Sequence, residues 1–224
     1  MYTREITASI ILIFLLSIIF LAPALIFKTT IFLIFGLALY ELFFLIKKPY
    51  WASMALLIFL IIFLLFANIF EENRMLFLFA IMISALNDSG AYYIGRKYGY
   101  KKIFPLTSPK KTLEGMMGGI LISSSTLYLI AYFQIIKFDL NFSFITGSIF
   151  YLILIVCSSM AVLGDFIESR IKRIANVKDS GSLLPGHGGI LDRIDSHIFV
   201  LPLFFILLGA VSYTHLTLPT IALV

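Results

Sequence analysis

The sequence predicts an all-α integral membrane protein, a polytopic helical bundle of about seven transmembrane helices with a polar site at its cytoplasmic face. Of the 224 residues, 61% are hydrophobic and only 13% are charged, about half the charged share of a soluble domain. The apolar residues form runs long enough to cross a bilayer, which takes roughly 17–25 residues per helix. A water-soluble fold could not cover so much apolar material, so that class is excluded.

Seven apolar runs give the expected helix count, and they cover residues 6–27, 30–46, 51–70, 75–95, 113–136, 143–166 and 197–213. The alternative interpretation of the first run is a signal peptide with Arg4 in its charged start. The run is longer than the roughly 7–15 apolar residues of such a peptide. We therefore interpret it as a retained helix and expect one membrane domain over 1–213. The end of the chain, 214–224, breaks the helical pattern, and we interpret it as a non-native tail.

Positive charges predict the orientation of this bundle. With a cytoplasmic N-terminus, the loops on that side carry fourteen of the seventeen Lys and Arg residues, and the opposite side carries only Lys28, Arg74 and Lys137. Positive residues concentrate in cytoplasmic loops, so we expect the loops 96–112 and 167–196 on the cytoplasmic face. The net charge of +5 follows from these loops and suits anionic lipid headgroups, and it requires no nucleic-acid partner.

Asp88 lies inside the expected span 75–95. A carboxylate at that depth costs at least about 2.5 kcal/mol on insertion scales, so it is a functional-site candidate. The alternative is that water reaches Asp88, since Arg96 follows eight residues later.

The segment SPKKTLEG predicts a helix start, with Ser108 as the N-cap and Pro109 at the first helical position. Lys110 and Lys111 would then lie in the first turn, where cations oppose the helix dipole. A bound anion would reverse that penalty, because free backbone N–H groups and two lysines form a phosphate site. Ordinary positive charge in a cytoplasmic loop is the alternative.

A polar segment separates the last two apolar runs. Asp165 and Glu168 are three residues apart at a helix end and share a face, as do Asp192 and Asp195 if DRIDS opens the next helix. Asp179 comes from the loop between them. Oxygen ligands from several elements suit Mg²⁺, and the sequence has no histidine or cysteine pattern for zinc.

Three glycines of this segment, Gly186, Gly188 and Gly189, allow the backbone to approach a ligand closely. His187 stands between them. A lone loop histidine is weak evidence, and a structural role and a catalytic role stay equally open for it.

The run SRIKRIANVKDSGSLLPGHGGILDRID resembles the signature of the phosphatidate cytidylyltransferases, or CDP-diacylglycerol synthases. Two upstream segments, DSGAYYIGRKYG and SPKKTLEG, also resemble that family, so that the likeness covers roughly 84–200. Family members are often longer, and the apolar N-terminal third matches only in character. Every fixed position of the signature is met: Ser169, Lys172, Arg173, Lys178, Asp179, Gly181, Pro185, His187, Gly188, Gly189, Asp192, Arg193 and Asp195.

The resemblance implies a nucleotidyltransferase of the plasma (inner) membrane that transfers the cytidylyl group of CTP to phosphatidate for phospholipid biosynthesis. Its catalytic part would be 75–200, with CTP, phosphatidate and membrane lipids as partners and a homodimer allowed. The expected metal ligands for Mg²⁺ are Asp179, Asp192 and Asp195, and a second, monovalent cation such as K⁺ is allowed nearby. The expected catalytic residues are these three with Lys178, Arg193 and His187. The expected substrate-binding residues are Asp88, Ser108, Lys110, Lys111, Lys172, Arg173, Gly188 and Gly189.

Two other functions stay open at this point. A CTP-dependent lipid kinase would transfer the γ-phosphoryl group to a polyprenol or phytol and would need a base. An ion-coupled transporter would use Asp88 as its intramembrane carboxylate, but such folds carry inverted repeats, which this sequence does not show.

Overall fold

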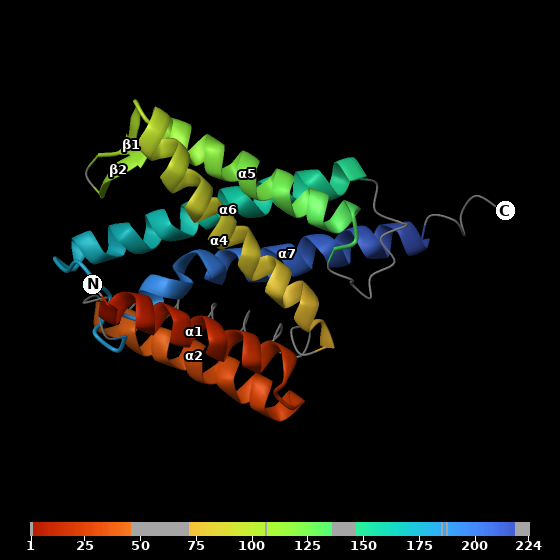
Figure 1. Ribbon diagram of the computed structural model, residues 1–224, viewed down its shortest axis with the longest axis horizontal. Coiled ribbons are helices and arrows are strands. Elements are labelled where there is room, and N and C mark those ends of the chain that lie inside the picture. The colour runs from red at the N-terminus through yellow and green to blue at the C-terminus, as the bar shows by residue number, and fades with distance from the viewer. Residues whose placement is uncertain are drawn as a thin grey trace. The chain divides into compact units, whose positions relative to one another are not determined.

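The computed structural model describes residues 2–45, 72–105, 107–135, 147–184, 186 and 188–217. These residues form six α-helices and one two-stranded hairpin (Figure 1). Five of the helices are long and apolar enough to cross a membrane, which confirms the all-α polytopic class, and α1 is a shorter apolar helix. The expected span 51–70 lies outside the described residues. In chain order the elements are α1 (Tyr2–Phe20), α2 (Ala24–Leu45), α4 (Arg74–Tyr98), β1 (Lys102–Phe104), β2 (Ser108–Thr112), α5 (Leu113–Tyr132), α6 (Gly147–Ile174) and α7 (Leu191–Thr217).

The chain forms two compact units, Met1–Arg74 with Asp165–Asp195 and Met75–Gly164 with Ser196–Val224. In the first unit, α1 and α2 lie side by side (Figure 1). The break between them lies at Pro23, so the expected break near Lys28 is wrong. Proline has no N–H to extend α1, whereas its carbonyl accepts the first bond of α2, from Phe27 N at 3.0 Å. Lys28 consequently lies in α2 and not in a loop.

Arg74 stabilises this α1–α2 turn. Its guanidinium donates to the carbonyl oxygen of Ala22 at 2.6 Å and lies 4.8 Å from the centre of the Phe27 ring. A charged donor therefore satisfies a backbone carbonyl at the end of α1 that has no partner within the helix.

In the second unit, α4 and α5 approach closely through glycines. A Cβ on Gly119 would lie 2.6 Å from the carbonyl oxygen of Asn87, and a Cβ on Gly90 would lie 3.2 Å from the Gly119 Cα. Small residues at such contacts let helix backbones meet in a membrane. Phe79 stacks on Phe204 at a centroid distance of 5.9 Å and contributes to the apolar core of this unit.

The expected helix start at Ser108 is wrong, because SPKKT is strand β2, paired antiparallel with β1. The N-cap is Thr112, whose Oγ1 accepts a hydrogen bond from Gly115 N at 3.2 Å, and α5 begins at Leu113. The Glu114 carboxylate accepts the backbone N–H groups of Tyr100 and Lys101, which fixes the chain entering the hairpin beside the start of α5. Lys110 and Lys111 therefore lie on extended backbone and not at a helix N-terminus.

Both later helices are longer than expected. α6 continues to Ile174, so Asp165 and Glu168 do lie on one helix, and α7 begins at Leu191, which confirms that DRIDS opens a helix. α7 runs to Thr217, past the expected end at 213, so the first residues of the expected tail are helical. The rest of that tail, 218–224, lies outside the described residues.

Candidate functional site

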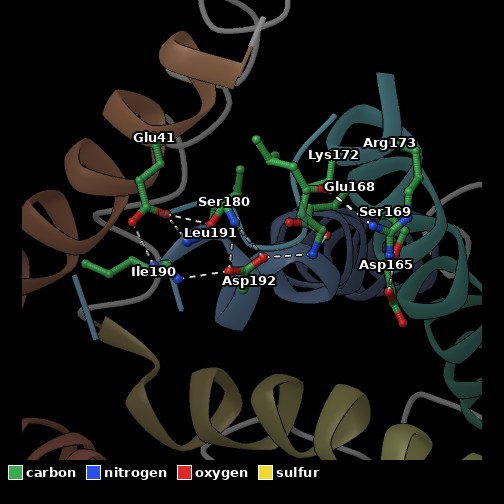
Figure 2. A network of polar contacts seen from close by, with 12 residues as sticks. Glu41, Asp165, Glu168, Ser169, Lys172, Arg173, Ser180, Ile190, Leu191 and Asp192 are labelled. Carbon is green, nitrogen blue, oxygen red and sulfur yellow. Dashed lines mark hydrogen bonds and ion pairs between the residues drawn. The ribbon is translucent and has the colours of Figure 1, made fainter. Parts of the chain in front are cut away.

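The first unit contains a polar cluster built by the end of α6, the loop after it and the first turn of α7 (Figure 2). Glu168 and Lys172 are four residues apart on α6 and so share a face. Lys172 Nζ lies 2.6 Å from Glu168 Oε2 and 2.8 Å from Asp192 Oδ1. The three side chains are nearly buried, with 14% of Lys172 and 7% of each acid exposed. The Lys172 ammonium thus compensates the carboxylates of Glu168 on α6 and Asp192 on α7.

The Asp192 carboxylate is also held by backbone N–H groups. Its Oδ2 accepts from Ser180 N at 2.9 Å and from Gly189 N at 2.8 Å. Charged acceptors make stronger hydrogen bonds than neutral ones, so Asp192 ties the loop after α6 to the start of α7 and has a fixed orientation.

Glu41 of α2 is a member of this cluster that the sequence analysis missed. It is only 4% exposed. Its Oε2 accepts from Ser180 Oγ and from Leu191 N, both at 2.9 Å, and its Oε1 accepts from Ile190 N at 3.1 Å. A signal was available, because an acid inside the apolar run 30–46 has the same cost that singled out Asp88.

The glycines of the loop have different surroundings. Gly188 has a φ of +85°, which favours glycine, and a Cβ there would lie 2.7 Å from Asp192 Oδ2 and 3.3 Å from Asp179 Cβ. Asp179 and Asp192 therefore border the same glycine. A Cβ on Gly189 would collide with Ser180 Oγ and with the Glu41 carboxylate, so protein atoms already occupy the space at Gly189.

Around this cluster, the other predicted residues of the first unit are mostly exposed. Lys178, Asp179, Arg173 and Arg193 are exposed, and Asp195 is half-buried on α7. His187 lies outside the described residues, so its role stays a prediction.

The carboxylates of this region can be compared with the needs of the expected Mg²⁺. Their chemistry fits, because Asp179 and Asp192 offer only carboxylate oxygens beside one glycine. Within the described ranges, however, no three or more His, Cys, Asp or Glu side chains are gathered as a metal site. Asp192 Oδ1 is paired with Lys172. The set of Asp179, Asp192 and Asp195 therefore stays a prediction.

Four predicted residues lie in the second unit. Lys111 of β2 interacts electrostatically with Asp88 of α4, so two of the four are brought together. Asp88 and Lys110 are exposed, whereas Ser108 and Lys111 are half-buried. The anion site predicted at Ser108 lacks the helix N-terminus on which that prediction rested.

Comparison with known proteins adds two findings. The family described as "Cytidylyltransferase family" matches residues 51–211, well over half of the chain. A phosphatidate cytidylyltransferase of Staphylococcus aureus (strain COL) is 42% identical over 146 residues, and one of Staphylococcus epidermidis (strain ATCC 12228 / FDA PCI 1200) is 46% identical over 146 residues. Both alignments cover 65% of this chain and 54% of the relative, so the chain spans about half the length of the curated relatives it matches.

Proposed function

Because the chain belongs to the cytidylyltransferase family, we propose that it transfers the cytidylyl group of CTP to phosphatidate, forming CDP-diacylglycerol and pyrophosphate for phospholipid biosynthesis. The observation that carries this proposal is the polar cluster of Glu168, Lys172 and Asp192, which lies inside the matched segment 51–211. Relatives that are 42% and 46% identical over 146 residues are named for that substrate.

In the proposed reaction, a phosphate oxygen of phosphatidate bonds to the α-phosphorus of CTP, and the bond between the α-phosphorus and the bridging oxygen to the β-phosphate breaks. The attacking phosphate is already ionised near neutral pH, so the reaction does not need a strong general base. The obstacle is the mutual repulsion of two anions and the charge on the departing pyrophosphate. Positioning and electrostatic stabilisation supply most of the catalysis in such transfers.

The first unit would bind the nucleotide. Lys178 of the loop after α6 and Arg193 in the first turn of α7 are exposed cations that would neutralise the triphosphate. Asp179, Asp192 and Asp195 would hold Mg²⁺, which when bound neutralises the phosphates of CTP and of the leaving pyrophosphate. A second, monovalent cation such as K⁺ belongs to the same proposal.

In the second unit, Lys110 and Lys111 are candidates for binding a substrate phosphate. Both lysines lie on β2 of the β1–β2 hairpin, and Lys111 interacts electrostatically with Asp88. The chain would be a multi-pass protein of the plasma membrane with the segments 96–112 and 167–196 facing the cytoplasm, in line with the many Lys and Arg residues that both segments carry.

The experiment is product analysis with purified protein, phosphatidate, Mg²⁺ and CTP radiolabelled on the α-phosphate. We expect labelled CDP-diacylglycerol in the lipid extract. Its formation should require phosphatidate and should stop in Asp195→Asn at equal protein yield. A wild-type preparation that is folded but leaves the lipid extract unlabelled would overturn the proposal.

A further inference from the structure

We propose that Glu41 is a positioning residue of the active site: it fixes the start of α7 and the loop around Ser180 and thereby holds Asp192 in place. The kinetic consequence rests on the proposed cytidylyl transfer, whereas the structural consequence does not. Glu41 lies upstream of the segment 51–211 that the family matches.

The Glu41 carboxylate accepts three hydrogen bonds. Two of its three donors, Ile190 N and Leu191 N, are backbone groups at the start of α7. Such N–H groups have no partner within their own helix, and a negative charge beside them is favourable. Glu41 is thus a cap for α7 supplied from a helix about 150 residues away in the chain.

Ser180 joins the carboxylates of Glu41 and Asp192. Its hydroxyl donates to Glu41 Oε2 at 2.9 Å, and its backbone N–H donates to Asp192 Oδ2 at 2.9 Å (Figure 2). A displacement of Glu41 would therefore move one of the donors that orient Asp192. The same displacement would also release the first turn of α7, on which Asp192 itself lies.

Two glycines of the loop, Gly181 and Gly189, lie against Glu41. The three atoms nearest to a Cβ on Gly181 would all belong to Glu41, with Cδ at 2.8 Å, Cγ at 3.2 Å and Oε1 closer still. A Cβ on Gly189 would collide with the same carboxylate and with Ser180 Oγ. Both glycines make room for Glu41, so the loop and the buried acid are matched to each other.

The first experiment compares wild type with Glu41→Gln, using Glu5→Gln as the matched control because Glu5 is an exposed acid on α1. An amide has one acceptor oxygen, so its NH₂ group must face one of the three donors. We expect kcat/KM for CTP to fall about 10-fold to 100-fold, the usual effect of losing a group that orients a ligand-binding side chain. Glu5→Gln should keep wild-type kinetics.

The second experiment tests the contact itself by a double-mutant cycle. Gly181 does not have a positive φ, and the atoms nearest to its added Cβ all belong to Glu41, so the strain of Gly181→Ala comes mainly from Glu41. We expect Gly181→Ala to lower kcat/KM in the wild-type background and to add no loss in the Glu41→Ala background. Additive losses would overturn the proposed contact, because independent sites add.

The third readout is amide hydrogen exchange, which does not depend on activity. Ile190 N and Leu191 N should be protected in wild type and should exchange at least tenfold faster in Glu41→Gln, at the rate expected for a released helix end. If Glu41→Gln does not fold, the milder Ser180→Ala, which removes one donor, should show faster exchange at Leu191 and reduced kcat/KM. Unchanged exchange and unchanged kinetics in the folded variant would refute the proposal.

These readouts separate the two proposals. An inactive wild-type protein with Glu41-dependent protection at 190 and 191 would refute cytidylyl transfer and retain Glu41 as the clamp of α7. An active wild type with a fully active Glu41→Gln would refute the positioning role and retain the function.

Discussion

The shared ammonium of Lys172 gives a quantitative prediction. In Lys172→Met, a side chain of similar length replaces the cation between Glu168 Oε2 and Asp192 Oδ1. Asp192 keeps the N–H donors of Ser180 and Gly189. Glu168 has no such support, since its Oε1 has no hydrogen-bond partner in the part of the chain that the structure describes. The variant therefore leaves mainly Glu168 as an uncompensated buried acid.

The size of the effect follows from the burial of this trio. Removing one member of a buried ion pair costs about 3–5 kcal/mol. Because only 7% of each acid is exposed, this range applies, and because Asp192 keeps its backbone donors, we expect the lower end, about 3 kcal/mol. At about 2–4 °C per kcal/mol for a chain of this size, Tm should fall by about 6–12 °C.

The assay is thermal unfolding of purified variants in one detergent. Lys178→Met is the matched control, because Lys178 is an exposed lysine of the adjoining loop, and its Tm should stay near that of wild type. Adding Glu168→Gln to Lys172→Met should recover part of the loss by neutralising the remaining acid. A Tm for Lys172→Met within about 2 °C of wild type, which is less than about 1 kcal/mol, would refute the idea that Lys172 compensates buried charge.

Three further predictions address packing, the loop and orientation. Gly119→Ala should lower Tm, since its Cβ would lie 2.6 Å from a carbonyl oxygen of α4. The control Gly36→Ala should leave Tm unchanged, because a Cβ there has nothing within 4 Å. Equal Tm values for the two variants would contradict the close α4–α5 contact. Gly188→Ala should cost about 1–2 kcal/mol for a left-handed backbone and reduce turnover; normal activity would show that the space beside Asp192 is not needed. A cysteine at Lys102 in a Cys157→Ser background should react with an impermeant thiol reagent only after permeabilisation, and labelling of intact cells would reverse the orientation.

Composition was sufficient to predict the fold class, because runs of apolar residues can only be covered by lipid or by each other. Helix boundaries were harder to predict. Pro23 lies inside a continuous apolar run, so hydrophobicity gave no sign of the break, although the missing N–H of proline did. At SPKKT the sequence analysis considered only Ser108 as the N-cap, but Thr112 caps the helix because pairing with β1 keeps Ser108 extended.

The candidate site was predictable where its residues are near in sequence. The signature run supplied Lys172 and Asp192, and a helical start at DRIDS was the condition under which Asp192 and Asp195 would share a face, although the expected span began only at 197. Glu41 was not found, because its partners are 139 to 150 residues away and only the folded chain shows which buried acid meets which helix end. The ion pair of Asp192 with Lys172 could not be predicted either, since spacing in the sequence does not indicate which cation a carboxylate pairs with.

The most direct test of cytidylyl transfer compares two positions of the label in CTP, using the purified protein with phosphatidate and Mg²⁺. We predict that a label on the α-phosphate enters the lipid extract as CDP-diacylglycerol, while a label on the γ-phosphate leaves as pyrophosphate. A γ-label in the lipid, with the α-label retained in a soluble cytidine diphosphate, would show a lipid kinase and contradict the proposed function.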